Sequence, residues 1–181
     1  MKVLVIPGSN RKKSFNKMLA KEIARNVTDG IEIVVFEIDN IPFFNQDIES
    51  DLPSIVNEYI EKVDSADAII FVTPEYNNMI PGILKNAIEW LSRGYSNHSV
   101  RNKPVAITGA TDGGFGTVRA QNQLLELCAI IKMKTHSQLR LPVSHADKIF
   151  DENGDLNDSE IELKIGKLLK DLKTFYESGE L

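Results

Sequence analysis

Residues 3–16 read VLVIPGSNRKKSFN and join a short apolar run to a polar loop. The run at residues 3–6 contains only branched aliphatic side chains, which is typical of a strand buried on both faces of a sheet. Pro7-Gly8 ends the strand, and Ser14 can cap the helix that the following apolar spacing predicts. A strand, a loop and a helix in this order form the repeating unit of an α/β fold.

The rest of the chain continues this alternation. We predict further strands at residues 31–38, 68–73, 104–108 and within 134–143. We predict further helices that begin at Pro53 and Pro81 or span residues 117–131 and 159–176. Five strands alternating with five helices predict an α/β fold with a parallel sheet covered on both faces, in a single domain over residues 1–181.

The charge balance excludes several classes of partner. The 181 residues carry 21 Lys and Arg against 26 Asp and Glu, a formal net charge of −5. Such a chain lacks the positive field that attracts nucleic acid or anionic lipid. Because no apolar run approaches the ~18 residues of a membrane span and no signal-peptide pattern opens the chain, we expect a cytoplasmic protein with no nucleic-acid or membrane partner.

Cysteine and histidine provide no metal site. Cys128 is the only cysteine, which excludes an internal disulfide and a four-cysteine zinc site. It lies within a helical apolar stripe, so we expect a packing role rather than a redox thiol. The three histidines, His98, His136 and His145, are too scattered to propose metal ligands or a catalytic triad.

The first loop, residues 8–16, has the chemistry of a phosphate site. Arg11, Lys12 and Lys13 sit together in an acidic chain, flanked by hydroxyl and amide side chains and followed by a helix start. Backbone N–H groups, a helix dipole and a guanidinium fork together bind phosphate. The alternative is a solvated turn with an ordinary Ser14 cap. The loop lacks the dinucleotide and triphosphate glycine patterns, so a terminal monophosphate fits it better.

Two later loops have the same position after a strand. Residues 73–82, TPEYNNMIPG, place a ring and amide groups between two stiffening prolines, which suits a ledge for a flat polar heterocycle. Residues 109–116, GATDGGFG, include four glycines that permit close backbone approach. A strand-to-helix turn beginning a helix at Pro81, and a flexible glycine turn, are the alternatives. In parallel sheets ligands bind beyond the carboxyl ends of such strands.

Three spaced motifs resemble the NADPH-dependent FMN reductase family. Residues 8–16 match its GSxRxxSxN pattern, and residues 73–93 match TPEYNxxxPGxLKNAIEWLSR. Residues 103–121, KPVAITGATDGGFGTVRAQ, match its third block, so the likeness runs in order over residues 1 to about 150. Asp112 and Asn78-Met79 depart from the family's pattern, which bears on substrate preference.

The resemblance implies a flavodoxin-like three-layer sandwich with strand order 2-1-3-4-5. It implies FMN as cofactor, NADPH or NADH as hydride donor, a small-molecule acceptor such as a flavin, quinone or azo compound, and two-electron ping-pong kinetics. No side chain is assigned as catalytic, because the flavin performs the redox step. The loops and the resemblance together predict these cofactor-binding residues: Ser9, Arg11, Ser14, Phe15, Asn16, Pro74, Glu75, Tyr76, Asn77, Ala110, Thr111 and Gly113.

The resemblance also implies a homodimer or homotetramer. Tyr95, Trp90 and the connection at residues 39–52 are candidate interface material, although Trp90 fits the core equally well. Two other functions remain open at this point: a flavodoxin-type electron carrier, and a non-catalytic sensor that binds FMN or phosphate. Turnover of NADPH with and without a quinone distinguishes the three.

Overall fold

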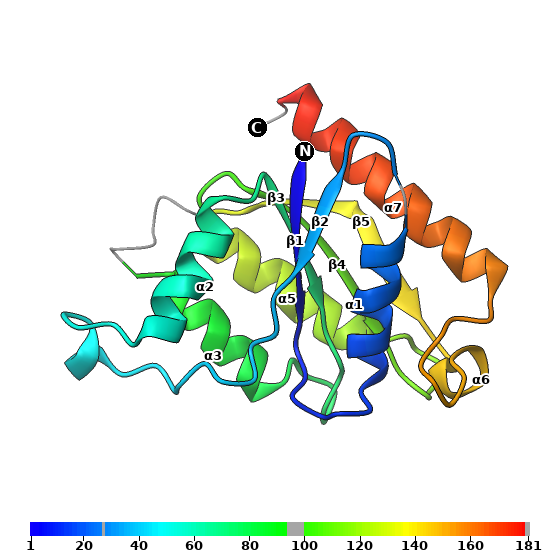
Figure 1. Ribbon diagram of the computed structural model, residues 1–181, viewed down its shortest axis with the longest axis horizontal. Coiled ribbons are helices and arrows are strands. Elements are labelled where there is room, and N and C mark those ends of the chain that lie inside the picture. Colours follow the sequence, from blue (N-terminus) through cyan, green and yellow to red (C-terminus); the bar gives the residue numbers. More distant parts are fainter. Residues whose placement is uncertain (27, 94–99, 180–181) are drawn as a thin grey trace.

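The computed structural model describes residues 1–26, 28–93 and 100–179. Strands and helices alternate along these residues (Figure 1). The strands are β1 (Lys2–Pro7), β2 (Glu32–Val35), β3 (Ala68–Val72), β4 (Pro104–Ala110) and β5 (Lys134–Val143). The helices are α1 (Phe15–Arg25), the 3-10 helix η1 (Gln46–Ile48), α2 (Ser54–Asp64), α3 (Gly82–Leu91), α5 (Val118–Ile130), α6 (Ala146–Ile149) and α7 (Ser159–Ser178).

The strands form a parallel sheet in the order β2-β1-β3-β4-β5, which confirms the predicted fold. The order reverses between β1 and β3, and this is where parallel sheets bind ligands. The carboxyl ends of β1, β3 and β4 point toward the lower edge of the view in Figure 1. The three loops with candidate chemistry therefore leave neighbouring strands at one edge of the sheet.

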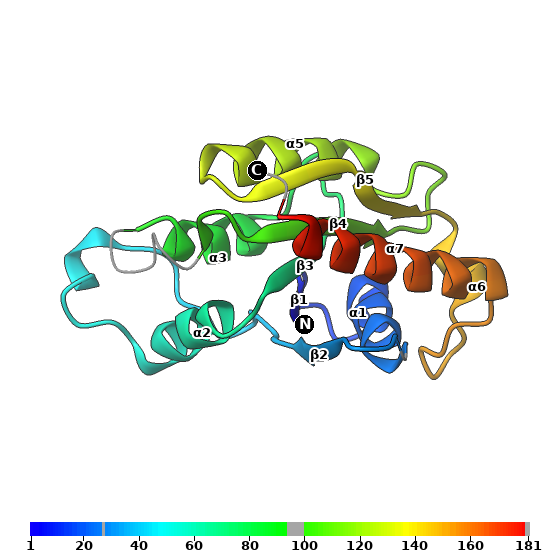
Figure 2. The ribbon, with the colours of Figure 1, turned by 90° about the horizontal axis from the view of Figure 1, so that it is seen from above.

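Helices cover both faces of the sheet and bury two apolar clusters. Alternate residues of the central strands face opposite sides: Leu4 and Ile69 pack with side chains of α2, α3 and α5, whereas Val3 and Ile70 pack with side chains of α1 and α7. Figures 1 and 2 show α2 and α3 beside one part of the sheet and α1 and α7 beside the other. Burial on both faces explains why the sequence of these strands is continuously apolar.

Two strand ends differ from the predicted bounds by more than one residue. β2 ends at Val35, the last residue in its register with β1, and the Phe36 ring beyond it stacks on Tyr59 with centroids 5.2 Å apart. β4 extends to Ala110 because β5 continues to pair with it as far as Val143. The short helices η1 and α6 were not predicted, since three or four residues leave no periodic pattern.

The long connection between β2 and α2 is held against α3. The Asn86 carboxamide accepts from the Phe44 N–H at 2.7 Å and donates to the Pro42 carbonyl at 2.9 Å. The indole N–H of Trp90 donates to the same carbonyl at 2.9 Å. Trp90 is fully buried, so it belongs to the core rather than to an interface; Tyr95 lies outside the described residues.

None of the helices in the described part of the chain is long and apolar enough to cross a membrane.

The Cys128 thiol is buried in the cluster beneath α5, and burial raises its pKa to about 12. A thiol that stays protonated at neutral pH is a poor nucleophile. The prediction of a packing role is therefore confirmed.

Gly109 is predicted to be intolerant of any side chain. A Cβ at this position would lie 2.1 Å from the Thr73 carbonyl oxygen and 2.2 Å from Thr117 Oγ1. We expect Gly109→Ala to destabilise the fold near the upper end of the ~1–3 kcal/mol typical of overpacking. Gly82→Ala is the control, because nothing lies within 4 Å of a Cβ there. Equal urea midpoints for the two variants would contradict this account.

Candidate active site

The three loops enclose a pocket of about 300 Å³ at the carboxyl edge of the sheet. Nine of the twelve predicted cofactor-binding residues line it, together with Asp112: Arg11, Ser14, Phe15, Asn16, Pro74, Glu75, Tyr76, Ala110 and Thr111. The other three, Ser9, Asn77 and Gly113, lie in the same loops but outside the lining. The structure thus brings together residues that are up to 100 positions apart in the sequence.

The first loop presents positive charge and backbone donors to this pocket. The Ser14 hydroxyl caps α1 by accepting from the Asn16 N–H at 3.2 Å, and buried Ser9 accepts from the Arg11 N–H at 3.3 Å. The Arg11 guanidinium is exposed and lies 5.7 Å from the centroid of the Phe15 ring. Among the described residues no carboxylate pairs with Arg11, and no acceptor takes the N–H groups of Lys13 and Phe15. A helix start with open N–H groups and an unpaired guanidinium favours an anion.

Asn16 has a positioning role. Its buried carboxamide donates to the Ala110 carbonyl and accepts from the Ala110 N–H, both at 2.9 Å. The first loop is thereby joined to the end of β4. Asn16, one of the predicted cofactor-binding residues, lines the pocket while its carboxamide is paired with the backbone of Ala110.

The second loop contains a tight hairpin. Tyr76 and Met79 exchange two backbone hydrogen bonds of 3.0 Å, with Asn77 and Asn78 at φ of 52° and 64° between them. Asparagine tolerates this left-handed conformation better than most residues, which explains the Asn-Asn pair. The Tyr76 N–H is consumed inside the hairpin, so it is not available to a ligand.

Glu75 connects the hairpin to α5. One of its carboxylate oxygens accepts from the N–H groups of Arg119 and Ala120, at 2.9 and 3.0 Å. Thr117, the residue before α5, makes no side-chain cap and has a φ of 61°. Glu75 therefore caps this helix from a distant loop, where its negative charge also complements the helix dipole. Glu75 therefore fixes the hairpin relative to α5.

The third loop supplies the remaining wall. The Gly113 N–H donates to Thr111 Oγ1 at 3.3 Å, and the Gly113 carbonyl accepts from the His145 N–H at 3.2 Å. Of the glycines in this loop, Gly116 has a φ of +56° and a Cβ there would lie 2.7 Å from Pro142. Gly113 has neither constraint, since a Cβ there would meet only Thr111 Oγ1, at 3.7 Å.

Apolar side chains lie exposed around the pocket mouth and the neighbouring loop. Tyr76 and Met79 are half exposed on the hairpin, and Phe115 is 65% exposed. The Arg119 guanidinium lies 4.7 Å from the Phe115 ring centroid and donates to Asn78 Oδ1 at 3.2 Å. These contacts place an aromatic ring, a cation and the hairpin side by side.

Two contributors escaped the sequence analysis of the site. Arg119 and Gln123 hold the hairpin to α5, the latter by accepting from the Ile80 N–H at 3.1 Å. Asp112, which the sequence singled out as a departure from the family pattern, lines the pocket. Arg119 and Gln123 are polar helix residues with no signal that distinguishes them from solvated ones.

No group of three or more His, Cys, Asp or Glu side chains arranged to hold a metal ion occurs in the described part of the chain. His98 lies outside it.

Comparison with known proteins identifies the family. Residues 1–148 match the model of the NADPH-dependent FMN reductases. The chain belongs to this family. The matched region contains all three loops and every residue that lines the pocket, while α7 lies beyond it. In a flavin-dependent oxidoreductase the cofactor carries the redox step and the protein supplies binding and orientation.

Two relatives and one solved structure are similar over most of their length. The chain is 36% identical over 174 residues to an NAD(P)H-dependent FMN reductase of Pseudomonas aeruginosa, covering 96% of this chain and 94% of the relative. It is 35% identical over 156 residues to a 2-hydroxy-1,4-benzoquinone reductase of a Burkholderia species, covering 86% and 85%. The structure of FerB, an NAD(P)H:(acceptor) oxidoreductase flavoenzyme from Paracoccus denitrificans, superposes with a TM-score of 0.85 at 27% identity and 99% coverage of both chains.

Removal of the Glu75 carboxylate is expected to loosen the hairpin and the start of α5. Glu75→Ala leaves two helix N–H groups without their acceptor, which costs ~1–2 kcal/mol, the typical value of a helix cap. Glu75→Gln keeps an oxygen acceptor and should lose less than half of that. Urea unfolding of both variants measures the difference. If both variants unfold at the same urea concentration, the cap has no energetic role.

Proposed function

We propose that this pocket binds FMN and that the protein is an NAD(P)H-dependent reductase of flavins, quinones or similar small acceptors. The observation that carries the proposal is the Arg11 guanidinium, with which no carboxylate of the described residues pairs, beside N–H groups at the start of α1 from which none of those residues accepts. The second and third loops line the rest of the same pocket, where a flat ring would lie beyond the phosphate. This donor set suits a phosphate monoester joined to a heterocycle.

The residues divide the work between binding and positioning. Arg11, the N–H groups of the first loop and the Ser14 hydroxyl would hold the phosphate, while Pro74, Tyr76, Ala110 and Thr111 would border the ring. Bound FMN would supply the two-electron redox chemistry between NAD(P)H and the acceptor. Glu75 and Asn16 act through the backbone, because their side chains fix the loops that carry the contacts.

An acceptor would enter at the pocket mouth. Tyr76 and Met79 offer an apolar surface there, which suits a flat and weakly polar molecule such as a quinone. The names of the Pseudomonas and Burkholderia relatives support flavin and quinone acceptors. The site needs no acid–base side chain for this exchange, so specificity would follow from shape and from the charge of Asp112 at the wall.

The test is steady-state oxidation of NADPH by FMN-loaded protein, with and without 1,4-benzoquinone. We expect turnover that rises with quinone concentration, with parallel double-reciprocal lines for the two substrates, because both use one site in turn. A flavodoxin-type carrier would bind FMN and oxidise NADPH negligibly. A sensor would bind FMN and reduce no quinone, and either result would refute the proposed enzyme.

The proposal includes a homodimer or homotetramer, one domain over residues 1–181 and a cytoplasmic location. The cluster of exposed apolar side chains at Tyr76, Met79 and Phe115 supports self-association, since contiguous patches of this kind mark interfaces. Sedimentation at micromolar concentration should give at least twice the chain mass of 20.3 kDa. A monomer with full NADPH turnover would contradict the oligomer.

Arg11→Ala should weaken FMN binding selectively. The change removes a charge-assisted hydrogen bond to a phosphate, which is worth ~1.5–3 kcal/mol, so FMN affinity should fall roughly tenfold to a hundredfold. Riboflavin lacks the phosphate and should bind almost as before. Arg11→Lys is the matched control, because it keeps the charge without the two-pronged guanidinium. Its FMN affinity should lie between those of the unaltered protein and Arg11→Ala. Fluorescence titration of both flavins measures this, and equal losses for both would place Arg11 away from the phosphate.

A further inference from the structure

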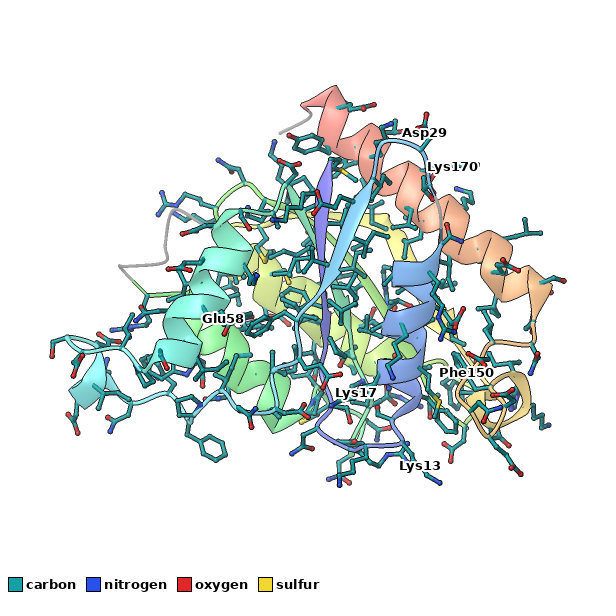
Figure 3. The ribbon with its side chains drawn as sticks, viewed as in Figure 1. Lys13, Lys17, Asp29, Glu58, Phe150 and Lys170 are labelled. Carbon is teal, nitrogen blue, oxygen red and sulfur yellow. The ribbon has the colours of Figure 1, made fainter. Side chains whose placement is uncertain are left out.

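We call the pocket that is proposed to bind FMN the flavin pocket. A second hollow, of about 420 Å³, shares the first loop with it. Arg11 lines the flavin pocket, and the next two residues, Lys12 and Lys13, line the second hollow. Lys17 and Lys21 of α1 continue the lining away from the flavin pocket. Figure 3 shows Lys13 near the tip of the loop and Lys17 above it on α1. We call this hollow the lysine pocket.

The opposite wall of the lysine pocket is held in place. The Arg25 guanidinium bonds the Asp155 carboxylate at 2.6 Å and so ties the turn after α6 to α1. Gly154 in this turn has a φ of +84°, and its backbone lies close enough that a Cβ would sit 3.1 Å from Met18 Cγ. The hollow is therefore bounded by two fixed walls rather than by one helix face.

Its charges leave positive groups available to a ligand. Five basic and three acidic residues line it, in a chain with a net charge of −5. Lys17 Nζ already pairs with Glu37 at 2.8 Å and with Asp39 at 2.6 Å. Lys12, Lys13 and Lys21 are exposed, and none of them has an ion-pair partner within residues 1–26, 28–93 and 100–179. Glu152 is the remaining acidic residue of the lining.

Resting on the proposed NAD(P)H oxidation, we propose that the lysine pocket binds the 2′-phosphate of NADPH and makes the protein prefer NADPH to NADH. A phosphate monoester carries about −1.5 to −2 charges at pH 7, and the ammonium groups of Lys12, Lys13 and Lys21 complement that charge. NADH presents a hydroxyl at the same position. A ribose diol is usually held by a carboxylate, but here Glu37 and Asp39 are engaged by Lys17.

The lysine pocket lies where it could receive the adenosine end of an NADPH whose nicotinamide reaches the flavin. The nicotinamide must reach the ring end of the flavin pocket to react, and Arg11 at the phosphate end of that pocket is the chain neighbour of Lys12. A dinucleotide with its 2′-phosphate in the lysine pocket would therefore pass over Arg11 and extend along the flavin pocket toward Pro74 and Tyr76. The two pockets use different residues, which allows each to be altered separately.

The binding test uses FMN-saturated protein, so that the flavin site is filled. Isothermal titration with adenosine 2′,5′-bisphosphate and with adenosine 5′-monophosphate compares two probes that differ only in the 2′-phosphate. We expect the bisphosphate to bind about tenfold more tightly, the effect of a few exposed ion pairs. Lys21→Glu should abolish the difference, because Lys21 lines only the lysine pocket. Lys170→Glu is the control, an exposed lysine of α7 that does not line the lysine pocket and lies above Lys13 and Lys17 in the view of Figure 3.

The kinetic test compares kcat/KM for NADPH and NADH. Lys21→Glu should lower the NADPH-to-NADH ratio about tenfold, whereas Lys170→Glu should leave it unchanged. The double variant Lys12→Ala/Lys13→Ala should lower the ratio in the same direction. Equal binding of the two probes by the unaltered protein, or equal ratios in Lys21→Glu and Lys170→Glu, would overturn the inference. Absence of NAD(P)H oxidation would instead refute the proposed function, while the binding comparison would still report on the lysine pocket.

Discussion

The paired hydrogen bonds between the Asn16 carboxamide and the Ala110 peptide are the constraint on which the site depends. They join the first turn of α1 to the last residue of β4, at the edge where the strand order reverses. Both groups are buried, so a loss of either bond would leave an unsatisfied polar group away from water. These bonds hold the first loop and the end of β4, which border the pocket on two sides, at a fixed separation.

The hairpin wall is positioned in the same manner. Glu75 replaces the local cap that α5 lacks, and in doing so fixes Pro74 and Tyr76 relative to that helix. The carboxylate thus accepts hydrogen bonds from the backbone of α5 and has a structural role. Side chains in this site set the geometry of backbone loops, which agrees with a reaction whose electrons are carried by a cofactor and whose protein contributes orientation.

Sequence reasoning recovered the alternation of strands and helices and the three loops because these depend on local patterns. Continuous apolar runs mark buried parallel strands, and the prolines and glycines mark where the strands end. The strand order came from the family resemblance, and the loops and the resemblance together identified most of the pocket lining. Sequence reasoning did not recover what each polar side chain does: Asn16 and Glu75 bind backbone atoms 94 and 44 residues away, and no local pattern specifies those partners.

Helix α1 serves both hollows, and its two features act differently on them. Its N-terminus presents backbone N–H groups toward the flavin pocket. The dipole of α1 favours negative charge there, and this effect is confined to the first turn of the helix. Its side carries Lys17 and Lys21 toward the lysine pocket, where charge acts through mobile ammonium groups. A backbone site is fixed once the fold exists, whereas a lysine site can be changed one residue at a time without disturbing the sheet. On the proposed assignments, FMN binding would be tied to the fold, whereas selection between NADPH and NADH could vary on the same scaffold.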